Sequence, residues 1–228
     1  MTPERYQKFK DLLDRRQPDL TVLTDQVHKP HNLSAIIRTC DAVGIPDIHL
    51  SQPKMGYRNF RGRTVGSHKY VNVHHHSSVE EGISQLKAKG FKVYAAHFSS
   101  TAIPYSEVDY TAPVAVMMGA EKKGISPEAA ELADQHIIIP MQGIVASFNV
   151  SVAAAVILVE AQRQRLLKGM YEEPSLPPEI YIPTLFRWGY PELARYCDER
   201  GLIYPEMDEC GQLVDPSSWY AKVRKNKV

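Results

Sequence analysis

Residues 20–44 read LTVLTDQVHKPHNLSAIIRTCDAVG and contain a strand pattern followed directly by a helix pattern. Residues 20–27 are rich in β-branched and apolar side chains, which is typical of a strand. The helical spacing of the apolar residues that follow predicts a buried stripe made of Leu33, Ile36, Ile37 and Cys40. Asn32, at the exposed start of the expected helix, is a plausible N-cap.

The same alternation continues to residue 165 of the chain. Further strand patterns lie at residues 45–52, 71–76, 91–98, 114–120 and 136–141, with helix patterns at residues 79–90 and 126–134. Strands that alternate with helices predict an α/β fold, in which a parallel sheet carries helices on both faces. The next helix, residues 147–165, is apolar nearly all round in its first turns, so we expect it to be buried in the core or against a second subunit.

The two ends of the chain differ in composition from this central region. Residues 1–18 predict a charged amphipathic helix that stops at a proline. The C-terminal part contains a proline-rich linker, EEPSLPPEIYIP, and then two short helical patterns, TLFRWGY and PELARYCDERG. We therefore expect an N-terminal helix (1–18), a central α/β domain (19–168) and a C-terminal helical extension (169–228).

Composition limits the classes of protein to which the chain can belong. With 228 residues, a net charge of +1 and no long apolar run, it is expected to be soluble and to lack a targeting or membrane segment. Its three cysteines are far apart, which argues against a disulfide framework and favours a reducing cytoplasm. The histidines at residues 74–76 end a strand pattern, where neighbours point to opposite faces, so no metal site is predicted.

Positive charge is clustered rather than spread along the chain. Residues 54–70 contain five lysines and arginines, interleaved with aromatic residues, and no acid. Like charges without compensating acids favour the binding of a polyanion, and a solubilising surface is the alternative. Smaller basic groups lie at residues 163–165 and at the end of the chain.

Three motifs lie just after predicted strands, where open α/β sheets bind their ligands. The first combines Asn32 with Arg38, the second is Gly119-Ala-Glu121-Lys-Lys-Gly124, and the third has Ser147 and Asn149 at the start of the apolar helix. Each has a structural alternative. Arg38 could be a surface arginine of an amphipathic helix, the glycines could form a simple turn, and Ser147 could be an N-cap.

In this order and spacing, the three motifs closely resemble those of the SpoU family of the SPOUT superfamily, which are RNA 2′-O-ribose methyltransferases. The matching positions are Asn32 and Arg38 in the first motif, Gly119, Glu121 and Gly124 in the second, and Ser147, Asn149 and Ser151 in the third. The terminal helices and several intervening segments look like those of the tRNA (guanosine-2′-O)-methyltransferases of this family. The resemblance extends over almost the whole chain.

The resemblance implies an α/β fold with a C-terminal trefoil knot, a homodimer, and transfer of a methyl group from S-adenosylmethionine to a guanosine ribose in the tRNA D-loop. Another RNA substrate, such as ribosomal RNA or the anticodon loop, and a non-catalytic RNA-binding role are the alternatives. The positions implied for cofactor binding are Ala96, Gly119, Gly124, Ile139, Met141 and Phe148. Ala96 and Phe148 stand where other side chains are common in the family.

The resemblance also implies which residues act in catalysis and in tRNA binding. The implied catalytic residues are Asn32, Arg38, Glu121, Ser147 and Asn149. Arg38 would either remove the proton of the 2′-hydroxyl or stabilise the alkoxide that forms, and the first role is demanding because arginine has a pKa of about 12.5 or higher. The residues expected to contact tRNA are His31, Arg58, Arg61, Arg63, Arg163 and Arg165.

Overall fold

The computed structural model describes residues 1–51 and 69–225, and the chain forms two compact units. Residues 17–173 form one unit, and residues 1–16 together with 174–228 form the other. Most of the basic block at 54–70, including Arg58, Arg61 and Arg63, therefore lies outside the described residues. None of the helices in the described part is long and apolar enough to cross a membrane.

The larger unit contains a seven-stranded sheet in the order β3-β2-β1-β6-β4-β7-β5, and every neighbouring pair is parallel. Its strands are β1 Leu20–Asp25, β2 Asp47–Ser51, β3 Asn72–His76, β4 Lys92–Ala96, β5 Ile103–Pro104, β6 Val114–Gly119 and β7 Gln135–Ile138. The predicted α/β fold is confirmed. The two-residue strand β5 was not predicted, because two residues cannot show the alternation that marks a strand.

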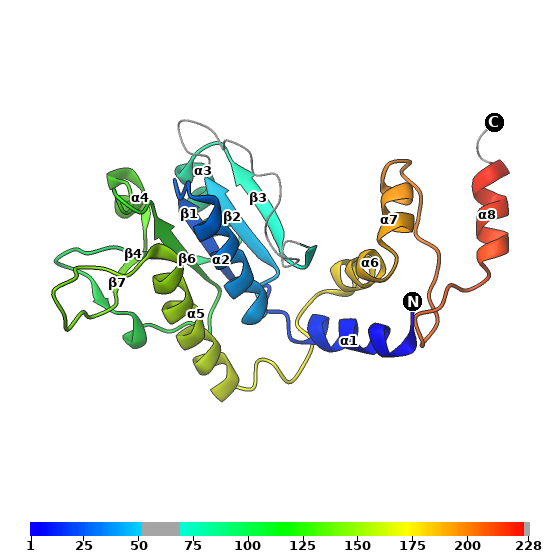
Figure 1. Cartoon of the computed structure of the whole chain (residues 1–228), viewed down its shortest axis with the longest axis horizontal. Coiled ribbons are helices and arrows are strands. Elements are labelled where there is room, and N and C mark those ends of the chain that lie inside the picture. The colour runs from blue at the N-terminus through cyan, green and yellow to red at the C-terminus, as the bar shows by residue number, and fades with distance from the viewer. Residues whose placement is uncertain (52–68, 226–228) are drawn as a thin grey trace. The chain divides into compact units, whose positions relative to one another are not determined.

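Helices cover both faces of this sheet (Figure 1). The helices of the larger unit are α2 Pro30–Ala42, α3 Val79–Ala88, α4 Pro127–Leu132 and α5 Val150–Leu167. Strand β6 shows why two layers form, since Val114 and Val116 pack with the buried residues of α2 and α5, whereas Ala115 and Met117 pack with those of α3 and α4. Alternate side chains of a strand point to opposite faces, and a strand that is apolar on both faces needs cover on both.

The predicted stripe of α2 is confirmed, but the predicted start of the helix is wrong. Leu33, Ile36, Ile37 and Cys40 are all buried. Asn32, however, is only 2% exposed and lies in the first turn, and the N-cap is Lys29. The helix begins earlier because Pro30 occupies its first position, where the fixed φ of proline suits a helix and its missing N–H has no cost.

The described residues of the smaller unit, 1–16 and 174–225, contain four helices, α1 Pro3–Asp14, α6 Pro178–Gly189, α7 Pro191–Asp198 and α8 Pro216–Lys225. Helices α1 and α6 pack together, with the rings of Phe9 and Trp188 in an edge-to-face contact 5.7 Å apart. Part of the predicted linker is therefore helical, since α6 begins at Pro178 and contains Pro183 in its interior. Helix α8 was not predicted; its mixture of polar and aromatic residues lacks a clear apolar stripe.

Candidate active site

The three sequence motifs meet at one edge of the sheet. Helix α2 follows β1, the turn at residues 119–124 follows β6, and the loop before α5 follows β7. Strands β1, β6, β4 and β7 are neighbours, and the last residue of β1, Asp25, lies beside Gly119 at the end of β6. Because all four strands are parallel, their carboxyl ends open at the same edge, where ligands of such sheets bind.

The second motif forms a tight turn that presents Glu121. Ala120 and Gly124 exchange two backbone hydrogen bonds of 2.9 and 2.8 Å. A Cβ atom at Gly119 would lie 2.2 Å from the carbonyl carbon of Gly124, and Gly124 has a φ of +68°. Both positions therefore need glycine for the turn itself, which is the structural alternative for this motif.

Glu121 begins a chain of hydrogen bonds that joins all three motifs. Its Oε1 accepts a 2.7 Å bond from Nδ2 of Asn32, whose Oδ1 accepts a 3.3 Å bond from Nδ2 of Asn149. Asn149 Oδ1 in turn accepts from the backbone N–H and the hydroxyl of Ser151, at 2.9 and 2.7 Å. Since an ionised carboxylate can only accept, Glu121 determines which way both amides point.

The charge of Glu121 is favoured by its surroundings. Its side chain is 8% exposed, and its Oε2 lies 3.2 Å from Nδ1 of His28. Burial alone would raise the pKa of this carboxyl, but the hydrogen bonds from backbone N–H groups and from Asn32, with the charge of His28, together lower it below 4.5. The carboxylate is therefore ionised at neutral pH and can orient the amides.

Asn149 precedes the apolar helix α5 because it is the N-cap of that helix. The expected start of the helix at Ser147 is wrong by three residues, since α5 begins at Val150. One asparagine thus performs two tasks: its oxygen caps the helix and its amide group reaches Asn32.

The remaining predicted catalytic residues lie outside this network. Arg38, Ser147 and the neighbouring His31 are all exposed. Within residues 1–51 and 69–225, none of these three side chains makes a hydrogen bond or ion pair. The structure therefore brings together Asn32, Glu121 and Asn149, and leaves the guanidinium of Arg38 available to a ligand.

The positions implied for the cofactor lie around the same edge. Ala96 ends β4, Gly119 ends β6, and Ile139 follows β7, so these three lie at the ends of adjacent strands. Ala96 and Ile139 are half-buried and pack against the core, whereas Phe148 is 44% exposed. In the described part of the chain, the backbone groups of residues 140–148 bond to no other backbone group. Apolar side chains beside available backbone donors and acceptors fit an adenosine moiety.

One predicted tRNA contact is wrong. Arg165 is 0% exposed, and its guanidinium donates to the side chains of Gln17 and Asp19 and to the carbonyls of Asp19, Tyr110 and Ala112. Arg163 is exposed and pairs with Glu160, at 2.7 Å. Two arginines that are close in the sequence therefore have opposite environments, because one faces the core and the other faces outward.

Sequence reasoning missed two residues of this edge. His28 lies between β1 and α2, and the rule that selected Asn32, a polar residue just after a strand, would also have selected His28. Asp25 is 1% exposed and its Oδ2 accepts a 2.6 Å bond from the backbone N–H of Ser126, at the start of α4. In the sequence, the position of Asp25 as the last residue of an apolar strand pattern could have identified it.

His74 and His76, two residues apart on β3, lie on the same face of the strand, as alternation predicts, and both contact His49 of β2. The centroid of the His49 ring lies 4.9 Å from that of His74 and 5.1 Å from that of His76, and its Nδ1 lies 2.8 Å from Nε2 of His76. Asp47 accepts a 2.6 Å bond from His74. Within residues 1–51 and 69–225, no group of three or more histidine, cysteine or acidic side chains has the arrangement of a metal site.

Comparison with known proteins identifies the family. The profile of the SpoU rRNA methylase family matches residues 19–159, and the profile of the C-terminal part of SpoU rRNA methylases matches residues 163–216. The chain belongs to this family. A protein of Escherichia coli K12, "tRNA (guanosine(18)-2′-O)-methyltransferase", is 46% identical over 98% of this chain and 99% of its own length.

Solved structures of the SpoU family agree with the fold. The TrmH/SpoU tRNA-modifying enzyme of A. aeolicus has a TM-score of 0.76 and 41% identity, and the match covers 83% of this chain and 97% of that one. An AdoMet-bound rRNA methyltransferase from Sinorhizobium meliloti has a TM-score of 0.58 and 31% identity over 67% of this chain and 59% of its own. The family resemblance read from the three motifs is thus confirmed, and it extends over most of the chain.

Proposed function

We propose that this protein transfers the methyl group of S-adenosylmethionine to the ribose 2′-hydroxyl of guanosine 18 in the D-loop of tRNA. The products are 2′-O-methylguanosine, S-adenosylhomocysteine and a proton. The full-length similarity to an enzyme with this printed activity supports the substrate. The observation that supports catalysis is the chain of hydrogen bonds from Glu121 through Asn32 to Asn149, together with an exposed Arg38 on the same helix as Asn32, which has no partner among the described residues.

In this proposal, Arg38 acts on the ribose oxygen. A ribose hydroxyl is a weak acid, so its reaction needs either a base for its proton or a positive charge beside the forming alkoxide. A guanidinium that is exposed and free of internal partners can take either role. Asn32 and Asn149 have fixed amide orientations and, with Ser147, position the ribose. Glu121 acts through these amides and is a positioning residue.

S-adenosylmethionine supplies the methyl group when it is bound. We assign its binding to the edge that contains the ends of β4 and β6 and the loop after β7. The residues are Ala96, Gly119, Gly124, Ile139, Met141 and Phe148. Backbone groups of the loop would pair with the adenine edge, and the apolar side chains would cover its faces.

The proposed tRNA contacts are His31 and Arg163, which are exposed, together with Arg58, Arg61 and Arg63, which are assigned from the sequence alone. Arg165 is no longer among them. The helices of the smaller unit would make further contacts with tRNA. The expected binding is electrostatic, so log affinity should fall linearly with log salt.

We further propose that the protein acts as a homodimer in the cytoplasm and contains the trefoil knot implied by the family. Helix α5 supports the dimer, because it has apolar residues on its outer side as well as toward the core. Val152, Val159 and Leu166, seven residues apart, are 45%, 55% and 55% exposed. An apolar stripe on the outer side of a helix is typical of a face that packs against a partner.

The direct test of this proposal uses labelled S-adenosylmethionine and an unmodified tRNA transcript. We expect one methyl group per transcript, on the 2′-oxygen of guanosine 18, located by nuclease digestion and mass spectrometry. A methyl on another nucleotide would contradict the assigned substrate. No incorporation by a folded protein that binds both partners would contradict the proposed activity.

A further inference from the structure

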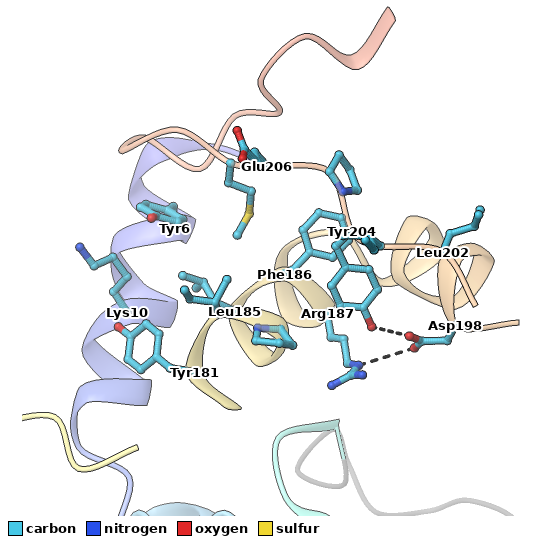
Figure 2. Close-up of a pocket in the computed structure, with 15 residues that line it drawn as sticks. Tyr6, Lys10, Tyr181, Leu185, Phe186, Arg187, Asp198, Leu202, Tyr204 and Glu206 are labelled. Atoms are coloured by element: carbon cyan, nitrogen blue, oxygen red, sulfur yellow. Dashed lines mark hydrogen bonds and ion pairs between the residues drawn. The ribbon is translucent and has the colours of Figure 1, made fainter. Parts of the chain in front are cut away.

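The smaller unit contains a pocket that no part of the methyl-transfer site uses. It lies between α1, α6 and the segment at residues 202–207, and has a volume of about 830 Å³ (Figure 2). Figure 2 shows Tyr6 and Lys10 of α1 on one side and Phe186 with Tyr204 on the other. Pockets of about 300–1,000 Å³ hold ligands of the size of a small drug, and a nucleotide is of this size.

The floor of the pocket is apolar and aromatic. Leu185 and Phe186 of α6 are 4% and 1% exposed. The ring of Phe186 stacks on that of Tyr204, with 4.5 Å between centroids and an angle of 15°. The guanidinium of Arg187 also lies over the Tyr204 ring, 5.5 Å from its centre. A flat ligand such as a nucleic acid base can pack against an apolar wall that carries such a cation.

Two polar groups at the side of the pocket have no protein partner among the described residues. The ammonium of Lys10 makes only a cation–π contact, 5.7 Å from the ring centre of Tyr6, and the hydroxyl of Tyr6 makes no hydrogen bond there. Tyr6 and Lys10 are one turn apart on α1 and both line the pocket. A free cation beside a free hydroxyl is suited to a phosphate and the polar edge of a base.

Four other polar side chains of the pocket already have partners within the unit. The hydroxyl of Tyr181 donates to Asp14 and that of Tyr204 donates to Asp198, at 2.7 and 2.5 Å. Arg187 also pairs with Asp198, 3.5 Å from its Nε. Asp198 is therefore neutralised within the unit and does not repel an anion, although Glu206 lines the pocket as well.

From these observations we infer that the pocket binds an unpaired nucleotide of the RNA substrate, other than the one that is methylated. Its base lies against the aromatic floor and its phosphate lies on Lys10. This inference rests on the proposed function, because it takes tRNA as the ligand. It adds a second contact point, in which an aromatic pocket rather than charge alone retains the RNA.

The experiment measures the affinity of the full-length protein for an unmodified tRNA transcript. Lys10→Glu is expected to weaken binding about tenfold, because it repels the phosphate. Lys8→Glu, on the same helix but outside the pocket lining, is the matched control and is expected to change binding less than about twofold. Equal weakening by both variants, or none by Lys10→Glu, would overturn the inference.

A second measurement tests the base itself. A transcript containing 4-thiouridine is irradiated with the protein, and the adducts are mapped by mass spectrometry. Adducts on peptides with Tyr6, Tyr181 or Tyr204 support the pocket, and adducts confined to residues 17–173 overturn it. The methylation assay on the wild-type protein separates the two proposals. If only the pocket inference is wrong, guanosine 18 is still methylated; if the proposed function is wrong, no methyl group is added there.

Discussion

Arg38 and Arg165 are arginines of the same α/β unit, and their guanidinium groups have opposite surroundings. Arg165, on α5, is sealed from solvent and all five of its N–H groups find acceptors within the unit. Arg38, on α2, is exposed and pairs with nothing in the described part of the chain. A guanidinium whose N–H groups are all bonded within the protein can only stabilise the fold, whereas one with free N–H groups can act on a ligand. We call Arg165, Gln17 and Asp19 the closed cluster. The open cluster is the hydrogen-bonded set Asn32, Glu121 and Asn149, considered together with Arg38, which shares helix α2 with Asn32 but makes no hydrogen bond to the set.

The largest effect on stability is expected from Arg165→Met in the closed cluster. The substitution leaves Asp19 and several buried carbonyls without donors, so the free energy of unfolding should fall by about 3–5 kcal/mol, measured by urea denaturation. Arg163→Ala, which removes an exposed ion pair with Glu160, is the control and should cost less than about 1 kcal/mol. Comparable losses for the two variants would show that burial does not distinguish these arginines.

Arg38→Ala should have the complementary effect on the open cluster. We expect the methylation rate to fall at least about 100-fold, because the substitution removes the group proposed to accept the proton or stabilise the alkoxide. The free energy of unfolding should change by less than about 0.5 kcal/mol, since the side chain is exposed. Near-normal methylation with intact binding of S-adenosylmethionine would contradict both proposed roles. Arg38→Lys then tests whether a fork of donors is needed.

The contrast between the two arginines also shows what sequence reasoning can reach. The apolar spacing of residues 20–44 correctly predicted the β1–α2 unit, because burial requires the same periodicity wherever the helix packs. It could not predict that Arg165 is buried, because its acceptors come from residues 17–19 and 110–112, which only the folded chain brings together. A cation at a helix position is read as exposed unless its partners are known.

The candidate site could be predicted from the sequence only in part, for a related reason. The three motifs identified Asn32, Glu121 and Asn149 as a group, and the structure places them in one hydrogen-bonded chain. Their local roles were harder to predict. Asn32 was expected to cap α2 and instead is buried within it, because a cap depends on where the first turn begins.

A smaller effect is expected from Glu121→Gln in the open cluster. The substituted amide can donate as well as accept, so it no longer determines the orientations of Asn32 and Asn149. We expect the rate of methyl transfer to fall about tenfold while the Kd for tRNA stays the same. Glu128→Gln, an exposed carboxylate of α4, is the matched control and should leave the rate unchanged. An unchanged rate for Glu121→Gln would remove this residue from the positioning role.

The smallest expected effect is a pH dependence of the stability that Glu121 contributes to the open cluster. Because hydrogen bonds and His28 hold the folded-state pKa of Glu121 below 4.5, its carboxylate stabilises the fold above this pH, and that contribution is lost as the pH falls through the lower, folded-state value. The difference in unfolding free energy between wild type and Glu121→Gln should therefore narrow as the pH falls below 4.5. A difference that stays constant to about pH 3 would show that the ionised state of Glu121 does not hold the open cluster together.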